Sequence, residues 1–181
     1  MNNYGIPVTL STAVAHALEH HLPVVALEST VITHGLPYPQ NFALLKRMES
    51  IITEQGAVPA TIIVWQGEAR IGLDAKLLEE IEAVLSPTQT AFMKLGSREL
   101  PLAFARAKNG GTTVSATMLL AQVAGIEVFA TGGIGGVHRG WQHSMDISMD
   151  LTALASIPVM VVSAGCKAIL DVPATLEKLE S

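Results

Sequence analysis

Three charged side chains of this sequence stand at the ends of apolar runs, or a few positions beyond them. They are Glu28, Lys94 and Lys167. A carboxylic acid can donate and accept protons, and an uncharged lysine amine can attack a carbonyl carbon. If the apolar runs are parallel strands, their carboxyl ends meet at one edge of a sheet, where ligands usually bind. The residue types therefore indicate acid–base and nucleophilic chemistry at that edge.

Each of these residues also has a simpler interpretation. Glu28 alone fits a strand-end glutamate that reaches solvent, and Lys94 fits a solvated turn residue. Lys167 is followed closely by Ile169 and Leu170. Such apolar neighbours disfavour the charged form of the amine, but the aliphatic stem can also cover an apolar surface while the ammonium group reaches water. The convergence of all three at one edge is harder to explain by packing.

A glycine-rich segment, 132–136, follows another apolar run and precedes the polar residues His138, Arg139 and Asp146. It does not match the dinucleotide pattern G-x-G-x-x-G, which would need glycine at position 138, and it contains no phosphate-loop Gly-Lys-Ser/Thr. Two interpretations remain open. The segment is a ligand-binding turn, or it is a tight connection between a strand and a helix.

Thr112 and Thr113 precede an apolar segment that is typical of a helix. The free backbone N–H groups at a helix start can bind an anion, because the helix dipole also favours negative charge there. The threonines can equally serve as simple caps of the helix.

The composition limits the class of protein. The chain has 181 residues, a net charge of −5 and one cysteine, Cys166. The scattered basic residues argue against a nucleic-acid surface, and the single cysteine excludes an internal disulfide. No apolar run is long enough to span a bilayer, and the N-terminus lacks a signal pattern. We expect a soluble cytoplasmic protein with a single α/β domain over 1–181.

Apolar runs alternate with helical patterns along the chain. This alternation predicts a three-layer α/β/α fold with a mainly parallel central sheet. The segment 66–73 is expected to be a hairpin or a turn, and the sequence Asn109, Gly110, Gly111 is expected to end a helix. Strands are expected over 24–27, 60–65, 90–93, 126–130 and 158–162, and helices are expected to begin near 12, 41, 75, 100, 116 and 175.

Long motifs of the sequence resemble the indigoidine synthase A family, the pseudouridine-5'-phosphate glycosidases. The motifs that carry this resemblance lie at 26–30, 34–41, 56–62, 108–114, 129–140 and 164–167. The resemblance covers nearly the whole chain but only somewhat more than half of the family's usual length. It implies that the C-terminal part of the family fold is absent.

The resemblance also implies an activity. Members of the family reversibly cleave the carbon–carbon bond between ribose C1' and uracil C5, giving ribose 5-phosphate and uracil. By motif, Glu28 would be the acid that opens the ribose ring and Lys167 the nucleophile that forms an imine. Asp146 would bind one Mn²⁺ per subunit of a homotrimer, largely through waters. Substrate would be bound by Lys94, Thr112, Thr113, Val114, Ser148, Met149 and Asp150.

The sequence departs from the family at several positions. Met149 and Cys166 stand where alanine is usual, and the segment 86–92 is a few residues longer. An active-site asparagine and the closing segment of the family fold would lie beyond Ser181. Two alternatives to the intact enzyme therefore stay open: a non-catalytic sugar-phosphate-binding domain, and one half of a split enzyme.

Overall fold

The computed structural model describes residues 5–85 and 92–181. Its central feature is a sheet of eight strands, six of which follow the order β1-β4-β3-β2-β7-β8. The strands are β1 (Val8–Leu10), β2 (Val24–Glu28), β3 (Val58–Trp65), β4 (Glu68–Ile71), β5 (Met93–Leu95), β6 (Gly110–Thr112), β7 (Val128–Thr131) and β8 (Met160–Ser163). The helices are α1 (Thr12–Glu19), α2 (Gln40–Glu54), α3 (Ala75–Leu85), α4 (Leu100–Ala105), α5 (Val114–Ala124), α6 (Trp141–Ser144), α7 (Met149–Ser156) and α8 (Val172–Glu180), together with a π-helical turn, η1 (Val31–Gly35).

The sheet is mainly parallel, as predicted. Strand β2 pairs in parallel with β3 and with β7, and β7 pairs in parallel with β8. The antiparallel pairs among the described residues are β3 with β4 and β3 with β6. The first of these pairs is the hairpin expected over 66–73. The parallel strands β2, β7 and β8 therefore send their carboxyl ends to the same edge of the sheet.

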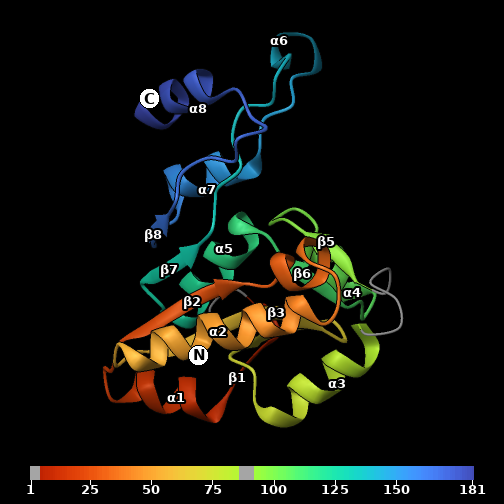
Figure 1. The fold of residues 1–181 in the computed structure, drawn as a ribbon, viewed down its shortest axis with the longest axis vertical. Helices are drawn as coiled ribbons and strands as arrows, with labels where there is room; N and C mark the ends of the chain where they lie inside the picture. Colours follow the sequence, from red (N-terminus) through yellow and green to blue (C-terminus); the bar gives the residue numbers. More distant parts are fainter. Residues whose placement is uncertain (1–4, 86–91) are drawn as a thin grey trace.

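Helices cover both faces of the central strands. Alternate residues of β2 and β3, such as Ala26 and Ile62, pack in one core with α1 and α5. On the opposite face, Ile63 and Trp65 of β3 pack with α2 and α3. Figure 1 shows α2 lying across β2 and β3. The three-layer prediction is confirmed over these strands.

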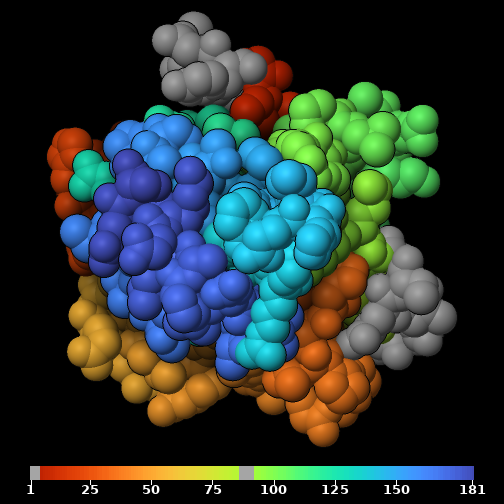
Figure 2. Space-filling view, turned by 90° about the horizontal axis from the view of Figure 1, so that it is seen from above, coloured from red at the N-terminus to blue at the C-terminus, as the bar shows by residue number. Residues whose placement is uncertain are grey.

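The C-terminal third extends away from this body. In Figure 1, α7 lies beyond α5, and α6 and α8 lie at the end of the molecule farthest from α1. Figure 2 looks down on that end and shows the cyan and blue C-terminal residues over its centre, flanked by orange and green segments. The starts of α1, α3, α7 and α8 are capped by the side chains of Ser11, Asp74, Ser148 and Asp171, respectively. Because Asp171 is the cap, α8 begins three residues before the predicted position 175.

Two predictions of secondary structure are wrong. Lys94 lies in the middle of β5 rather than after a strand, while positions 90 and 91 of the predicted strand lie outside the described residues. Gly110 and Gly111 do not end a helix but form β6, between β5 and β3. A side chain at Gly111 would overlap Thr33, so glycine allows the strand to approach η1 closely.

The predicted strand 158–162 is real, but only one of its faces is buried. Val161 packs against the main core, whereas Met160 and Val162 are 67% and 56% exposed. Strand β8 therefore has one buried and one exposed face among the described residues. Among the described residues, no helix is both long and apolar enough to cross a membrane.

Candidate active site

Glu28 is the last residue of β2, and its carboxylate is largely buried. Thr131, the last residue of the neighbouring strand β7, donates a hydrogen bond from Oγ1 to Glu28 Oε1 at 2.5 Å. Burial raises the pKa of Glu28, and the opposing effects of the Thr131 hydrogen bond and of the Lys167 charge are smaller. Glu28 therefore holds its proton to a higher pH than an ordinary glutamic acid, which suits a general acid.

Lys167 lies in the loop after β8. This loop is joined to the glycine-rich loop, because Ile134 N donates to Gly165 O at 3.0 Å and Lys167 N donates to Ile134 O at 3.1 Å. The strand order that places β7 between β2 and β8 brings Lys167 close enough for its charge to act on Glu28. The two side chains therefore share one edge of the sheet, as the sequence predicted.

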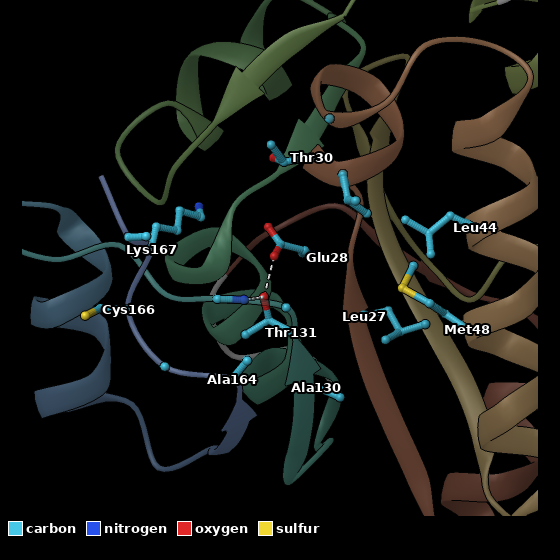
Figure 3. Close-up of a pocket in the computed structure, with 16 residues that line it drawn as sticks. Leu27, Glu28, Thr30, Leu44, Met48, Ala130, Thr131, Ala164, Cys166 and Lys167 are labelled. Carbon is cyan, nitrogen blue, oxygen red and sulfur yellow. Dashed lines mark hydrogen bonds between the residues drawn. The ribbon is translucent and has the colours of Figure 1, made fainter. Parts of the chain in front are cut away.

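Glu28 and Lys167 line a common cavity of about 600 Å³. Figure 3 shows the Lys167 side chain extending toward the Glu28 carboxylate, with Leu27 and the α2 residues Leu44 and Met48 beyond it. The cavity thus has a charged end, where proton transfer and nucleophilic attack can occur, and an apolar end against α2.

A second cavity of about 410 Å³ shares Lys167 with the first. Its wall carries the basic residues Lys94, Arg98 and His138. Such a group of donors suits an anion with several oxygens, such as a phosphate. Other candidate residues of the sequence line this cavity as well: Thr113, Asp146, Ser148, Met149 and Asp150.

Asp150 occupies the helix start where the sequence suggested an external anion, and it also contacts the glycine-rich loop. Its side chain accepts hydrogen bonds from Ser115 N, at the start of α5, at 3.0 Å and from Gly135 N, in the glycine-rich loop, at 2.8 Å. The residue is only 5% exposed. The anion held by the helix start and by the glycine-rich loop is therefore the protein's own carboxylate.

The glycine-rich loop needs its glycines for this contact. A Cβ at Gly135 would lie 2.6 Å from Asp150 Oδ2 and would also overlap Ser148. At Gly135 the closely approaching groups are Ser148 and Asp150, at the start of α7, whereas Gly132 and Gly133 of the same loop line the first cavity.

The three candidates at the start of α5 differ in their surroundings. Thr113 lines the second cavity, and its side chain does not cap the helix. Thr112 and Val114 are fully buried and line neither cavity. The Thr112 hydroxyl donates to Ile62 O at 2.7 Å. The side chains of Thr112 and Val114 therefore support the wall from behind, and the expectation that these two residues bind substrate stays a prediction.

Asp146 is the only metal ligand that the sequence suggested. Its side chain is 62% exposed and lies 3.7 Å from His138 Nδ1. No group of three metal-ligating side chains occurs among the described residues. One carboxylate fits a hard divalent cation only if water supplies most of the coordination shell.

Sequence reasoning missed the roles of Thr131, Arg98 and His34. Thr131 directly precedes the glycine-rich segment, and its partner Glu28 is 103 positions away in the chain. Arg98 follows Lys94 closely, which is a signal that could have been used. Burial lowers the pKa of His34, and the charge of Lys94 adds to this effect, which places His34 near the same basic group.

Comparisons with known proteins agree with this geometry. A family model described as indigoidine synthase A like protein matches residues 13–181. A pseudouridine-5'-phosphate glycosidase of Paracoccus denitrificans is 55% identical over 174 residues, which are 96% of this chain and 56% of that protein. The protein of the same name from Arabidopsis thaliana is 51% identical over 174 residues, which are 96% of this chain and 52% of that protein.

Solved structures give the same result. A prealnumycin C-glycosynthase in complex with ribulose 5-phosphate superposes with a TM-score of 0.85 at 38% identity, over 96% of this chain and 55% of that one. An indigoidine synthase A-like protein of Thermotoga maritima superposes with a TM-score of 0.83 at 37% identity, over 99% of this chain and 56% of that one. The chain spans about half the length of the relatives it matches. Over that span, sequence and fold agree, and the chain belongs to the indigoidine synthase A family.

Proposed function

We propose that this chain carries the Glu28–Lys167 centre of a pseudouridine-5'-phosphate glycosidase, which reversibly cleaves the C1'–C5 bond to give ribose 5-phosphate and uracil. The relatives that bear this name support the proposal. The observation that carries it is the cavity that Glu28 and Lys167 share. An acid and an amine in one cavity are the two groups that this bond cleavage needs.

The C1'–C5 bond joins two carbon atoms, so no heteroatom can leave with its electron pair, and the reaction needs another group to stabilise the charge. Glu28 gives a proton to the ring oxygen as the C1'–O4' bond breaks, and the Lys167 amine forms a bond to C1'. When the C1'–C5 bond breaks, its electron pair goes to uracil C5, which takes up a proton, and the lysine nitrogen stabilises the resulting iminium carbon. Water then releases ribose 5-phosphate and restores the amine.

The second cavity is the proposed phosphate site. A ribose C1' bonded to Lys167 lies at the boundary of the two cavities, so the 5-phosphate can reach Lys94, Arg98 and His138. The ribulose 5-phosphate bound to the C-glycosynthase relative supports a sugar phosphate as ligand. Thr113, Ser148 and Met149 would line the sugar and phosphate, while Asp150 holds the wall in place.

We further propose one Mn²⁺ at Asp146, beside the phosphate site, and a homotrimer, both on the family resemblance alone. The cation would neutralise phosphate charge. Electron paramagnetic resonance of Mn²⁺ titrated into the protein tests the site. Asp146→Ala should lose the bound signal, while the exposed control Glu79→Ala on α3 should keep it. Equal binding by both variants would exclude Asp146.

Reductive trapping tests the activity. The chain is incubated with ribose 5-phosphate and cyanoborohydride, and modified lysines are mapped by peptide mass spectrometry. We expect one adduct, on Lys167, that disappears in Lys167→Ala and persists in the exposed control Lys108→Ala. Binding of ribose 5-phosphate without an adduct would favour the non-catalytic sugar-phosphate-binding domain.

A further inference from the structure

Hydroxyl side chains gather between the end of β2 and β6. They belong to Ser29, Thr30, Thr112 and Thr117, which we call the hydroxyl cluster. Three of them, Ser29, Thr112 and Thr117, are completely buried, and Thr30 lines the first cavity close to Glu28 (Figure 3). A buried hydroxyl group costs free energy unless it is hydrogen-bonded. Each hydroxyl group of the cluster has a hydrogen-bond partner, and the bond cleavage proposed above uses none of them.

The hydroxyl cluster joins the residues that follow Glu28 to β6. The backbone N–H of Thr112 donates to Ser29 Oγ at 2.9 Å. Thr30 Oγ1 donates to Thr112 O at 2.8 Å and to Gly111 O at 3.3 Å. Since Ser29 and Thr30 directly follow Glu28 in the chain, these bonds hold β6 against the end of β2.

The cluster also joins β6 to β3 at the level of Glu28. The sheet register places Ile62 of β3 beside Glu28. Thr112 Oγ1 donates to Ile62 O at 2.7 Å and accepts a hydrogen bond from Thr117 Oγ1 at 2.9 Å. Two neighbouring strands therefore fix β6 relative to Glu28. A buried network whose members are all hydrogen-bonded favours one arrangement of the elements that it joins.

Strand β6 in turn positions Lys94. In the parallel pair of β5 and β6, Lys94 is the register partner of Gly111, whose carbonyl group Thr30 contacts. Burial has the largest effect on the pKa of Glu28, and the Lys94 charge is among the smaller effects that lower it. The amine therefore lies within electrostatic reach of the carboxyl group. Lys94 also lines the second cavity together with Lys167.

We propose that the hydroxyl cluster sets the spacing between Glu28 and Lys94 and thereby selects the length of the sugar phosphate. A five-carbon sugar with C1 at Lys167 and its phosphate at Lys94 spans both cavities. A sugar with one carbon fewer cannot place both of its ends correctly while β6 is held in position. The members of the cluster are positioning residues. The inference rests on the proposed function, because it takes the two ends of the ligand to be those of ribose 5-phosphate.

Competitive trapping measures this selection. The chain is incubated with equal amounts of ribose 5-phosphate and erythrose 4-phosphate in cyanoborohydride, and the two Lys167 adducts, which differ in mass, are quantified by peptide mass spectrometry. The adduct ratio of a variant is divided by that of the unaltered chain, so that the intrinsic reactivities of the two aldehydes cancel. We expect Thr30→Val to lower the preference for ribose 5-phosphate by roughly tenfold, since small misplacements of a binding group have large effects on rate.

Three further variants separate positioning from stability. Thr30→Ser keeps the hydroxyl group and should restore the preference. Ser29→Ala removes the acceptor of the Thr112 N–H and should lower the preference as Thr30→Val does. The matched control is Thr61→Val. It also removes a buried threonine hydroxyl, which donates to Glu49 at 2.6 Å, but Thr61 lines neither cavity. This control should keep the preference, and thermal melts compare the stability of all four variants.

A binding measurement separates this inference from the proposed activity. Phosphorus-31 NMR titrations give the dissociation constants of both sugar phosphates without requiring an imine, and their ratio should change in Thr30→Val in the same direction. If the unaltered chain forms no adduct but prefers to bind ribose 5-phosphate, and Thr30→Val loses this preference, the activity is contradicted and the positioning role is supported.

Four results would overturn the positioning role. They are the absence of any binding preference in the unaltered chain, an unchanged preference in Thr30→Val, a preference that Thr30→Ser does not restore, and an equal loss of preference in Thr61→Val. The last result would mean that any weakening of the sheet relaxes the selection, with no special part for the hydroxyl cluster.

Discussion

At the scale of single residues, the hydrogen bond from Thr131 to Glu28 tunes the candidate acid. The hydroxyl donates to the carboxylate at 2.5 Å and thereby lowers the pKa of Glu28 against the larger effect of burial. Thr131→Val removes the donor and keeps the shape of the side chain. We expect the pKa of Glu28 to rise further, so that the protonated acid persists to higher pH.

Carbon-13 NMR titration of the Glu28 carboxyl group measures this shift without requiring activity. Thr131→Ser restores a hydroxyl and should return the titration close to that of the natural chain. If Thr131→Val and Thr131→Ser shift the pKa of Glu28 by the same amount, the side chain of Thr131 contributes packing alone.

Burial of Glu28 also makes stability depend on pH. Folding raises the pKa of Glu28. At a pH below the pKa that Glu28 has in the unfolded chain, this residue therefore favours the folded state. The contribution is lost as the pH rises through the pKa that Glu28 has in the folded chain. Glu28→Gln should therefore stabilise the chain at pH 8, by about 1 kcal/mol or about 2–4 °C in Tm, while it removes the acid.

Glu49 on α2 provides the matched control for that experiment. Burial raises its pKa too, and Thr61 donates to its carboxylate at 2.6 Å, but Glu49 lines neither cavity. Glu49→Gln should raise Tm at pH 8 and leave trapping on Lys167 unchanged. Thermal melts at pH 5 and pH 8 check both variants, and a loss of stability in Glu28→Gln at pH 8 would contradict the assignment.

At the scale of elements, Asp150 joins α5, α7 and the glycine-rich loop through two backbone N–H groups. Gly135→Ala would push a methyl group against this carboxylate and against Ser148. We expect a loss of about 1–3 kcal/mol in the free energy of unfolding, as for other overpacked sites.

The same loop supplies its own control. A Cβ at Gly132 would have no neighbour within 4 Å, so Gly132→Ala should change stability by no more than about 0.5 kcal/mol. Chemical denaturation of the two variants distinguishes them. Equal losses would mean that the loop needs glycine for its backbone conformation rather than for the approach of α7.

The elements also show what a sequence can and cannot predict. Glu28 and Lys167 were placed at one sheet edge because apolar runs reveal parallel strands and their ends. The burial of Thr112, the bridging role of Asp150 and the exposure of β8 were not predicted, because each depends on partners far away in the chain. Gly110 and Gly111 were misinterpreted for the same reason, since only their tertiary neighbours make a strand of them.

At the scale of the whole molecule, the second cavity brings basic groups together in a chain whose net charge is −5. Lys94, Arg98 and Lys167 line this cavity together with three carboxylates, Glu99, Asp146 and Asp150, of which Glu99 and Asp150 already accept hydrogen bonds from backbone N–H groups. If the proposed sugar phosphate binds here, the three basic groups would attract it although the molecule as a whole repels it. Salt screens such attraction, with a Debye length of about 10 Å at 0.1 M and about 3 Å at 1 M.

This predicts a specific dependence on ionic strength. Trapping of ribose 5-phosphate on Lys167 should slow by roughly tenfold between low and high salt, because the phosphate reaches the site through screened charges. Ribose without phosphate is the control ligand and should be trapped slowly at every salt concentration. Arg98→Ala should bring the salt dependence of ribose 5-phosphate close to that of ribose. Rates of adduct formation give the comparison, and an equal salt response for both sugars would place the phosphate outside the second cavity.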